Sequence, residues 1–497
     1  MIINQIKLKP GESKDHLPLK IQKKTGKKVR NWRIIRESID ARNKGDIRLV
    51  YSVEYNYDPS EKPEFVIPEA VSDRSPAVIG FGPCGIFCAL VLARAGLKPM
   101  VFERGMDVDT RTEQVDRFWK EGILDTESNV QFGEGGAGAF SDGKLTTGIK
   151  DPAVGFVLSE LASHGGPEEI LYKARPHIGT DVLKTVVKNI REEIISLGGQ
   201  VIFGARVTGI STEEGRVRGL TYLKDGEEKK VSADSVVLAI GHSSRDTFKI
   251  LRDMGIGMTQ KQFSMGIRIE HPQELIDIAQ YGKPGKELGL PPADYKLSTR
   301  TAEGRGVYTF CMCPGGKVIC ASSEEGMTVT NGMSYHARNS GFANSAVLVD
   351  VRTEDFGTDD VLGGMYLQQK YERIAYERGG GYRLPKAYWK EVREGSAPQV
   401  TDCLPDFVCG SLKEAMPEFG KRIRGFDGDE AVCYAVEARS SSPVRIVRDE
   451  NRQGYLGEEA LIGFYPSGEG AGYAGGIVSA AVDGIRTALK IIDSLNK

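Results

Sequence analysis

The feature that most constrains the fold is a glycine-rich turn between an apolar run and a segment suited to a helix. Residues 77–79 are apolar and typical of a buried parallel strand. The turn that follows reads Gly80-Phe81-Gly82-Pro83-Cys84-Gly85. Glycines at this spacing permit a tight turn, a close approach of the backbone to a pyrophosphate, and close packing of helix on strand. A helix is expected over residues 84–95, with its N-terminus directed at the anion.

A second strand with an acid at its end supports the same dinucleotide-binding unit. Val101 and Phe102 are apolar, and Glu103 follows Gly85 by 18 residues. An acid about 20 residues after the last glycine accepts hydrogen bonds from a ribose hydroxyl in dinucleotide-binding proteins. Glu103, with Arg104 beside it, is therefore a candidate cofactor-binding residue. The alternative is a glycine-rich turn without a ligand, because the 60 glycines of the chain make chance matches easy.

Composition limits the classes of protein that remain. A chain of 497 residues is long enough for about two or three domains. Its net charge of −2 gives no overall attraction to nucleic acid or to a membrane. The eight cysteines are scattered without CxxC or zinc-site spacing, which favours a reducing compartment and no metal. Neither a signal-peptide core nor an apolar run of membrane-spanning length is seen, so we expect a cytoplasmic protein.

Residues 1–72 are predicted to form a small α+β domain ahead of the glycine turn. The apolar patterns predict the order strand, helix, strand, strand (βαββ), over residues 2–8, 15–25, 29–41 and 46–57. Prolines and charges over 61–76 mark a linker. Residues 1–50 contain 14 Lys and Arg against 5 Asp and Glu. This basic surface is a solvated face, a face that docks on an acidic part of the same chain, or a site for RNA or another polyanion.

A second glycine-rich stretch covers residues 129–147. Glycine density in this stretch excludes a stable helix or a central strand. Within eleven residues the stretch contains Gly133, Gly135, Gly136, Gly138 and Gly143. We expect a loop whose backbone approaches a flat or phosphorylated group, with Ser141 and Lys144 adding polar contacts. The alternative is a mobile surface loop.

Later segments predict the remaining elements of an α/β fold. The predicted helices cover 181–197, 367–378 and a last segment through Leu495, and apolar residues recur at helical spacing in the first of them. The predicted strands lie around 201–210, 217–223, 229–232, 235–240 and 462–466. A hairpin that turns at Pro314 is expected within 309–320.

Three of these features together resemble the FAD-binding fold of the glutathione-reductase and p-hydroxybenzoate-hydroxylase group. They are the β-meander after residue 200, the strand ending at Gly241, and the Gly468-Glu469 turn before the last helix. The resemblance implies that Glu469 lies beside the ribityl chain and pyrophosphate of FAD. It also implies that residues 472–477 face the flavin and that the backbone of Val207 contacts the adenine. A helix N-terminus at the flavin would stabilise negative charge on its reduced form.

The two glycine stretches and this resemblance give a set of expected FAD-binding residues. These are Gly80, Gly82, Pro83, Cys84, Gly85, Glu103, Arg104, Gly135, Gly136, Ser141, Gly143, Lys144, Val207, Gly241, Gly468, Glu469, Gly472, Tyr473, Ala474, Gly475, Gly476 and Ile477.

Longer blocks of sequence resemble a bacterial family of uncharacterised FAD-dependent dehydrogenases. The blocks are 36–42, 131–145, 176–181, 310–316, 331–334, 437–445 and 466–476. Ser440 stands where a threonine is expected after Ala-Arg. The resemblance implies an α/β protein with a Rossmann-like FAD-binding domain built from residues 73–250 and 460–497. It further implies an α+β substrate domain inserted over residues 251–459.

Three residues are candidates for the chemistry of such an oxidoreductase. Hydride transfer at a flavin needs little acid–base help, but the substrate usually needs one proton donor or acceptor. Lys144 could stabilise an anionic flavin or a substrate carboxylate, and Arg439 could bind an acidic substrate. His177 is one of only six histidines and precedes a predicted helix. Each of the three has an alternative structural role, as a solvated lysine, an ion-paired arginine or a hydrogen-bonded histidine.

The cysteines have weaker claims to a role in catalysis. Cys311 and Cys313 share one face of a strand and are read as two small buried residues, with a redox pair as the alternative. Cys84 and Cys88 lie on the first helix and are read as core packing.

The predicted function is FAD-dependent hydride transfer to or from a small organic substrate. The sequence has no second strand–GxGxxG–helix unit that is followed by its acid, so NAD(P)H would be a transient electron donor that visits the substrate face. One alternative is a flavin monooxygenase. Another is an RNA-associated flavoprotein that uses the basic residues 1–72 to hold nucleic acid.

Overall fold

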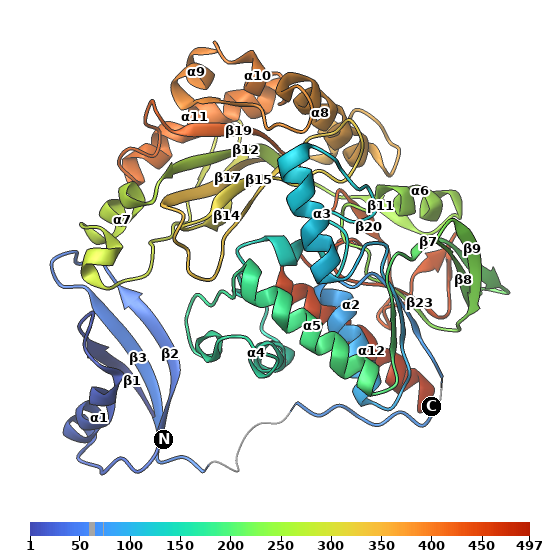
Figure 1. Ribbon diagram of the computed structural model, residues 1–497, viewed down its shortest axis with the longest axis horizontal. Coiled ribbons are helices and arrows are strands. Elements are labelled where there is room, and N and C mark those ends of the chain that lie inside the picture. Colours follow the sequence, from blue (N-terminus) through green and yellow to red (C-terminus); the bar gives the residue numbers. More distant parts are fainter. Residues whose placement is uncertain (59–64, 73) are drawn as a thin grey trace.

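The computed structural model describes residues 1–58, 65–72 and 74–497. The described residues form a lobe around a parallel sheet, a lobe around a larger antiparallel sheet, and a small N-terminal sheet at one side (Figure 1). Of the linker expected over 61–76, residues 61–64 and 73 lie outside the described residues. Among the described residues, no helix is both long enough and apolar enough to cross a membrane.

A five-stranded parallel sheet forms the centre of the first lobe. Its spatial order is β23-β10-β4-β5-β6. The strands are β4 (Ala77–Ile79), β5 (Met100–Phe102), β6 (Gln200–Ile202), β10 (Val236–Leu238) and β23 (Phe464–Pro466). Ile79, Phe102 and Leu238 pair in register at the carboxyl ends of three neighbouring strands. The loops after these strands therefore open at one edge of the sheet, where open α/β sheets bind their ligands.

Helices cover one face of this sheet, and a β-meander with one helix covers the other. The elements are α2 (Pro83–Arg94), α3 (Val108–Glu121), α4 (Ala153–Ser163), α5 (Thr180–Ser196), α6 (Arg245–Asp253), α12 (Ile477–Leu495), β7 (Arg206–Glu213), β8 (Arg216–Lys224) and β9 (Glu227–Ser232). Helices α2, α4, α5 and α12 cover the first face, and α6 lies with the meander on the other. Helix α2 packs against the sheet, α5 and α12, so every residue over 84–93 is buried. Figure 1 shows α2, α5 and α12 side by side. The helices expected over 84–95, over 181–197 and through Leu495 are confirmed.

The single strand expected around 201–210 is wrong, because the chain forms two strands there. Strand β6 ends at Ile202 in the parallel sheet, and β7 begins at Arg206 in the meander. Gly204 lies between them with φ +64°, a left-handed conformation that suits glycine. The chain therefore leaves one sheet for another within a few residues, a change that the apolar pattern does not reveal.

A six-stranded antiparallel sheet forms the second lobe, in the order β13-β14-β17-β12-β19-β18. The strands are β12 (Phe263–Pro272), β13 (Ser298–Arg300), β14 (Gly306–Cys313), β17 (Phe342–Val351), β18 (Lys386–Tyr388) and β19 (Val432–Glu437). Helices on one face are α7 (Gln273–Tyr281), α8 (Gly363–Gly379), α9 (Trp389–Glu394), α10 (Pro398–Thr401) and α11 (Asp406–Arg422). The helix expected over 367–378 is α8 and is confirmed.

Strand alternation divides this sheet into an apolar face and a polar face. On β12, Met265, Ile267 and Ile269 join the core beneath the helices. Side chains alternate along a strand, so Arg268 lies on the opposite face, where it contacts Glu437 of β19. Figure 1 shows the helices outside and the first lobe on the opposite side of the sheet. The polar face is therefore turned toward the open edge of the parallel sheet.

The hairpin expected within 309–320 is wrong. Strand β14 pairs with β13 at its start and with β17 along its length, and it does not pair with the segment after Pro314. The next segment, β15 (Lys317–Cys320), pairs instead with β16 (Thr330–Met333). Pro314 and its glycines thus carry the chain out of one sheet and into another. Two further pairs, β11 (Met258–Gln260) with β20 (Val444–Ile446) and β21 (Tyr455–Leu456) with β22 (Glu459–Ala460), complete the strands of the described residues.

The N-terminal sheet has the order of elements expected from the sequence. It contains β1 (Ile2–Leu8), α1 (Leu17–Thr25), β2 (Trp32–Asp40) and β3 (Arg48–Tyr55), arranged β1-β3-β2. Strand β2 continues its pairing beyond the small sheet: the Glu37 N–H donates to the Tyr172 carbonyl oxygen, and the Ala174 N–H donates to that of Glu37, both at 2.8 Å. The side chain of Ile47 enters the core of the antiparallel lobe. This domain is therefore attached to both lobes.

Close packing of the glycine turn leads to a stability prediction. A Cβ atom on Gly85 would lie 1.9 Å from the Gly80 carbonyl oxygen, so Gly85→Ala must move helix α2 away from its strand. We expect a loss of about 1–3 kcal/mol in the free energy of unfolding, measured by chemical denaturation. The matched control is Gly155→Ala in helix α4, where a Cβ meets nothing within 4 Å. That change should be neutral or stabilising, by up to about 1 kcal/mol. Equal effects of both substitutions would contradict the packing argument.

Candidate functional site

A cavity lies between the open edge of the parallel sheet and the polar face of the antiparallel sheet. Its first-lobe lining comes from the two glycine-rich stretches, the end of β5, and the segments over 205–207, 239–247 and 475–480. The second lobe contributes Phe310, Cys311, Asn331, Glu437, Arg439 and Ser440. Segments that are far apart in the sequence thus enclose one space with glycine backbone at one side and charged side chains at the other.

The glycine-rich backbone forms a cradle for an anion. A Cβ on Gly80, whose φ is +96°, would lie 2.5 Å from the Ala239 carbonyl oxygen, and a Cβ on Gly136 would lie 3.1 Å from Gly82 Cα. The two glycine-rich stretches therefore touch at the first turn of α2. Gly138 lies against Ile477, the first residue of α12. Two helix N-termini with free N–H groups converge here, as a pyrophosphate requires.

The Glu103 carboxylate holds both glycine-rich stretches in place. It accepts hydrogen bonds from the N–H groups of Phe81 at 2.7 Å, and of Gly105 and Gly133 at 2.9 Å each. A carboxylate has about four acceptor sites, so one is left toward the cavity that Glu103 lines. Glu103 can therefore accept a hydrogen bond from a ribose hydroxyl, as expected, while it also holds the backbone of the two glycine-rich stretches. The sequence did not predict this second role.

Arg104 lines the cavity but is already neutralised. Its guanidinium lies over the Phe132 ring, 4.2 Å from the ring centroid, and pairs at 2.9 Å with both Glu127 and Asp246. Arg104 therefore offers an apolar platform and a shared charge rather than a free cation.

Most of the expected FAD-binding residues line the cavity. They are Gly80, Gly82, Pro83, Cys84, Glu103, Arg104, Gly136, Ser141, Gly143, Lys144, Val207, Gly241, Glu469, Gly475, Gly476 and Ile477. The structure brings these residues together from segments as distant as 80 and 477. Their contact with a cofactor stays a prediction, because it follows from placement alone.

The structure places the other six expected residues outside the lining. Gly85 and Gly135 pack the glycine-rich stretches, since Gly135 N–H donates to the Phe81 carbonyl oxygen at 2.9 Å. Gly468 N–H donates to Asp483 at 2.8 Å. Gly472, Tyr473 and Ala474 precede the lining residues of the last helix, and the Tyr473 hydroxyl donates to the Ile446 carbonyl oxygen at 3.1 Å. These residues support the backbone of the cradle through their own contacts and do not line the cavity.

Lys144 presents a cation at the cavity. Its ammonium donates to the Met312 carbonyl oxygen and pairs with Asp142 at 2.9 Å. Burial acts to lower the pKa of Lys144, but the Asp142 carboxylate outweighs it and holds the pKa above its usual range. Asp142 also pairs with Arg338 at 2.5 Å, which keeps the carboxylate ionised. Lys144 is therefore a protonated, firmly positioned group whose charge is partly shared.

His177 lies behind Lys144 and not in the cavity lining. The backbone of 143–145 pairs with that of 176–178, and the His177 ring stacks on His336 with 5.2 Å between centroids. Burial lowers the pKa of His177 to about 3, so the ring is neutral at pH 7. The structure therefore gives His177 a place in the support of Lys144, and a direct catalytic role stays a prediction.

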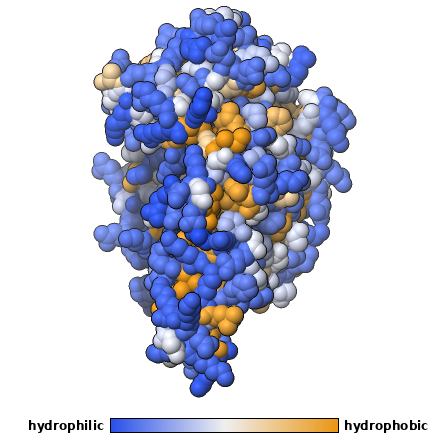
Figure 2. All heavy atoms as spheres, turned by 90° about the vertical axis from the view of Figure 1, so that its left-hand side faces the viewer, coloured by the Kyte–Doolittle hydropathy of each residue, from blue (hydrophilic) through white to orange (hydrophobic). Residues whose placement is uncertain are grey.

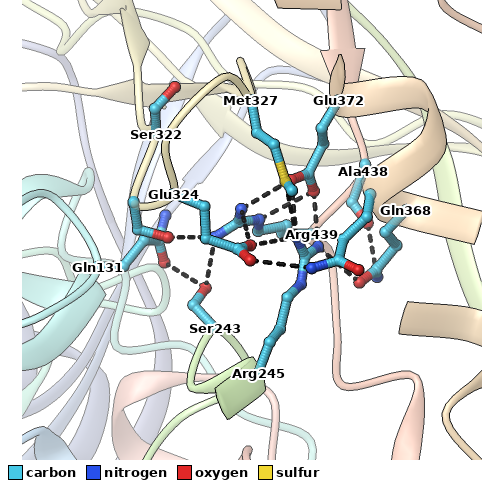
Figure 3. A network of polar contacts seen from close by, with 12 residues as sticks. Gln131, Ser243, Arg245, Ser322, Glu324, Met327, Gln368, Glu372, Ala438 and Arg439 are labelled. Carbon is cyan, nitrogen blue, oxygen red and sulfur yellow. Dashed lines mark hydrogen bonds and ion pairs between the residues drawn. The ribbon is translucent and has the colours of Figure 1, made fainter. Parts of the chain in front are cut away.

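Arg439 belongs to a buried ion-pair network at the junction of the two lobes (Figure 3). Glu372 of α8 accepts from Arg439 of the second lobe and from Arg245 of α6, with the closest contacts at 2.7 Å for both. Arg439 also donates to Ser323 at 2.6 Å and Ser243 at 3.1 Å. Burial acts to raise the pKa of Glu372, but the two arginines lower it to about 2. These contacts give Arg439 the structural role that was the alternative, and its expected role in binding an acidic substrate stays a prediction.

Two functional candidates were missed from the sequence. Glu437 lines the cavity and forms a bidentate pair with Arg268, with both contacts at 2.9 Å. His242 also lines the cavity, and burial with the nearby Arg439 lowers its pKa to about 3. Glu437 is the first residue of the block 437–445, whose resemblance to the family could have indicated it. His242 follows Gly241 directly, and only its position after a parallel strand could have indicated it.

Glu469 is a partly buried acid at the wall of the cavity, close to the first turn of α12. Removal of its carboxyl from water raises its pKa to about 7, and the Lys261 charge acts only weakly against this. The ionised form is therefore disfavoured unless a ligand donates hydrogen bonds to it, as the expected ribityl hydroxyls would.

Titration of Glu469 makes the stability of the cofactor-free protein depend on pH. The ordinary pKa of a glutamate is 4.5 and the folded value is about 7, so the folded state binds the proton more tightly. Stability relative to Glu469→Gln should be fully present below pH 4.5 and be lost as the pH rises toward 7. Thermal unfolding of both forms from about pH 4 to about pH 8 tests this. A constant difference in melting temperature across that range would contradict the shift.

Loss of the Glu372 carboxylate should leave two buried arginines with only the more exposed carboxylate of Glu324 to share. For Glu372→Gln we expect a loss of about 3–5 kcal/mol in the free energy of unfolding, because removal of one partner from a buried ion pair has that effect. The control is Glu324→Gln, which contacts the same arginines but has a side chain that is 25% exposed. Solvent compensates for that loss, so a smaller effect is expected. Chemical denaturation of cofactor-free protein compares the two, and equal losses would contradict the burial argument.

Comparison with known proteins identifies the family. Residues 262–440 match the family described as "FAD-dependent protein, C-terminal domain-like", and residues 1–56 match a domain of unknown function (DUF8436). An uncharacterized protein of Clostridium beijerinckii is 44% identical over 538 aligned residues, which cover 99% of both chains.

Several solved structures are also similar to this chain. A single-residue mutant of halogenase PltM in complex with FAD is 13% identical, with a TM-score of 0.42 over 85% of this chain and 70% of that one. L-proline dehydrogenase from P. horikoshii is 12% identical, with a TM-score of 0.36 over 86% and 94% of the two chains. Given the full-length relative and the matched family model, the chain belongs to a family of FAD-dependent proteins, and FAD is its cofactor.

Proposed function

We propose that the protein is an FAD-dependent oxidoreductase that exchanges hydride with a small organic substrate. The observation that carries this proposal is the shared cavity, in which the glycine cradle and Lys144 of one lobe face Cys311 and Glu437 of the other. In this proposal residues 73–250 and 460–497 form an FAD-binding domain of the glutathione-reductase and p-hydroxybenzoate-hydroxylase type. Residues 251–459 supply the substrate side.

The residues of this chain have distinct tasks in the proposed reaction. FAD, when bound, supplies hydride acceptance and donation. The helix N-termini and glycine backbone bind its pyrophosphate, and the remaining acceptor site of Glu103 binds a ribose hydroxyl. The Lys144 ammonium, held by Asp142 and the Met312 carbonyl oxygen, places positive charge at the cavity. That charge stabilises an anionic reduced cofactor or orients a substrate carboxylate.

The electron donor in this proposal is NAD(P)H, bound transiently. No second strand–GxGxxG–helix unit followed by its acid occurs in the sequence, so a nicotinamide would have to enter the same cavity from the side of the antiparallel sheet. The half-buried Asn331 and the Glu437–Arg268 pair are polar groups available there.

The N-terminal domain is better suited to internal docking than to RNA binding. At least five of its cations form ion pairs within the domain, through Glu12, Glu37, Asp40, Asp46 and Glu54. Its strand β2 is joined by backbone hydrogen bonds to residues 172–174. The side of the molecule that carries this domain and α7 is largely hydrophilic, with a broken band of hydrophobic atoms (Figure 2). These features support an attachment role for the basic residues.

Anaerobic titration with NADPH and then NADH tests the proposed function. We expect the flavin absorption to bleach, and Lys144→Met to slow the bleaching by about 10²-fold because one charge-stabilising group is lost. The control is Lys249→Met, an exposed lysine on α6. Normal FAD content with normal reduction kinetics in Lys144→Met would remove Lys144 from this role. A flavin spectrum that neither nucleotide changes would contradict NAD(P)H as donor.

A further inference from the structure

Strand β14 ends in a bulge that sets two cysteines at different depths. Phe310 pairs with Ala346 and Cys313 pairs with Asn344, so three steps along β14 oppose two along β17. Cys311 lies in this bulge with φ +43°, a left-handed conformation that is uncommon for a residue with a side chain. Bulges of this kind re-aim side chains beside active sites. Here Cys311 lines the cofactor cavity, and Cys313 is fully buried behind it.

The peptide that joins the two cysteines is fixed by cations from both sides. The Lys144 ammonium donates to the Met312 carbonyl oxygen, and Arg268 donates to the Cys311 carbonyl oxygen at 3.2 Å. The Cys313 thiol donates to the same Cys311 oxygen at 3.3 Å, so it lies directly against the residue that faces the cavity. Both cysteines are free, and their positions are set by groups that already belong to the site.

The surroundings activate Cys311 and leave Cys313 protonated. Hydrogen bonding with the Cys313 side chain lowers the pKa of the Cys311 thiol, and the charges of Lys144 and Arg268 act in the same direction. The same hydrogen bonding and burial raise the pKa of Cys313. Burial raises the pKa of Cys88 and Cys433, which lie in the two cores, and also that of Cys84 at the first turn of α2. A thiol with thiolate character beside a second, protonated thiol is the arrangement of a reactive and a resolving cysteine.

We propose that Cys311 and Cys313 form a redox-active dithiol that exchanges an electron pair with FAD. When the pair is oxidised, both S–H bonds are lost and one S–S bond forms. Two electrons and one proton pass to FAD, which becomes its reduced anion, and the second proton leaves to solvent. In reverse, reduced FAD returns two electrons, and each sulfur gains a proton as the S–S bond breaks. Cys311 is the sulfur on the cavity side, and Cys313 closes the disulfide.

Such a pair would give the protein a second two-electron centre beside the cofactor. This goes beyond hydride exchange with a substrate, and it needs no nicotinamide. Its test therefore uses dithionite as the reductant. The electron count can then be interpreted even if NAD(P)H does not reduce the flavin.

The first experiment counts electrons in the holoprotein. Protein is oxidised with diamide, desalted and titrated anaerobically with dithionite. We expect uptake of four electrons per FAD in the natural protein and two in Cys313→Ser. The control is Cys409→Ser, a half-buried cysteine on α11 outside the cavity lining, which should still take up four. Uptake of two electrons by the natural protein would overturn the proposal, as would uptake of four by Cys313→Ser.

The second experiment needs neither bound FAD nor a variant. Cofactor-free protein is treated with diamide, alkylated under denaturing conditions and digested. The peptide that contains residues 311–313 should then be unalkylated and lighter by two hydrogen atoms than the reduced peptide. Recovery of that peptide with both thiols alkylated would show that the pair does not close, and the proposal would be wrong.

Discussion

The site depends on the buried carboxylate of Glu103 at the end of β5. Its two oxygens accept the backbone N–H groups of Phe81 and Gly133, one from each glycine-rich stretch, and that of Gly105, and a buried carboxylate is tolerated only when it is bonded in this way. Arg111 complements it, because this buried guanidinium donates to the carbonyl oxygens of Asn129, Val130 and Glu134. Glu103 thus accepts from an N–H group of the second glycine-rich stretch, and Arg111 donates to carbonyl groups of the same stretch. A glycine-rich segment with little side-chain packing of its own is held by these two charges.

The junction of the lobes is held by charge as well as by apolar packing. Glu372 joins Arg245 of the first lobe to Arg439 of the second, and Arg268 joins Glu437 within the second lobe. Buried ion pairs contribute little net stability compared with apolar replacements, but each buried charge demands its partner. We therefore expect these contacts to fix the relative orientation of the two lobes and to add little to the stability of their interface.

Sequence reasoning succeeded where the determining contacts are local. The strand, glycine turn, helix α2 and Glu103 follow one another within about thirty residues of an expected βαβ unit, and the structure contains them. Sequence reasoning failed where a strand or a side chain has a partner that is remote in sequence. The pattern over 309–320 is compatible with a hairpin, but β14 pairs with the distant β17 and β15 pairs with β16. The split at Gly204 and the pairing of Arg268 with Glu437 likewise depend on tertiary neighbours that no local pattern encodes.

The ion pairs around the cavity suggest which groups bind the cofactor and which groups influence the reaction. Arg104 is paired with Glu127 and Asp246, Lys144 with Asp142, and Arg439 with Glu372. We therefore expect a cofactor pyrophosphate to find few uncommitted side-chain cations and to bind chiefly to the N–H groups at the starts of α2 and α12. Backbone donors cannot titrate, and salt screens buried groups weakly. Cofactor binding should then depend mainly on glycine geometry, while Lys144 and its neighbours are left to influence the reaction.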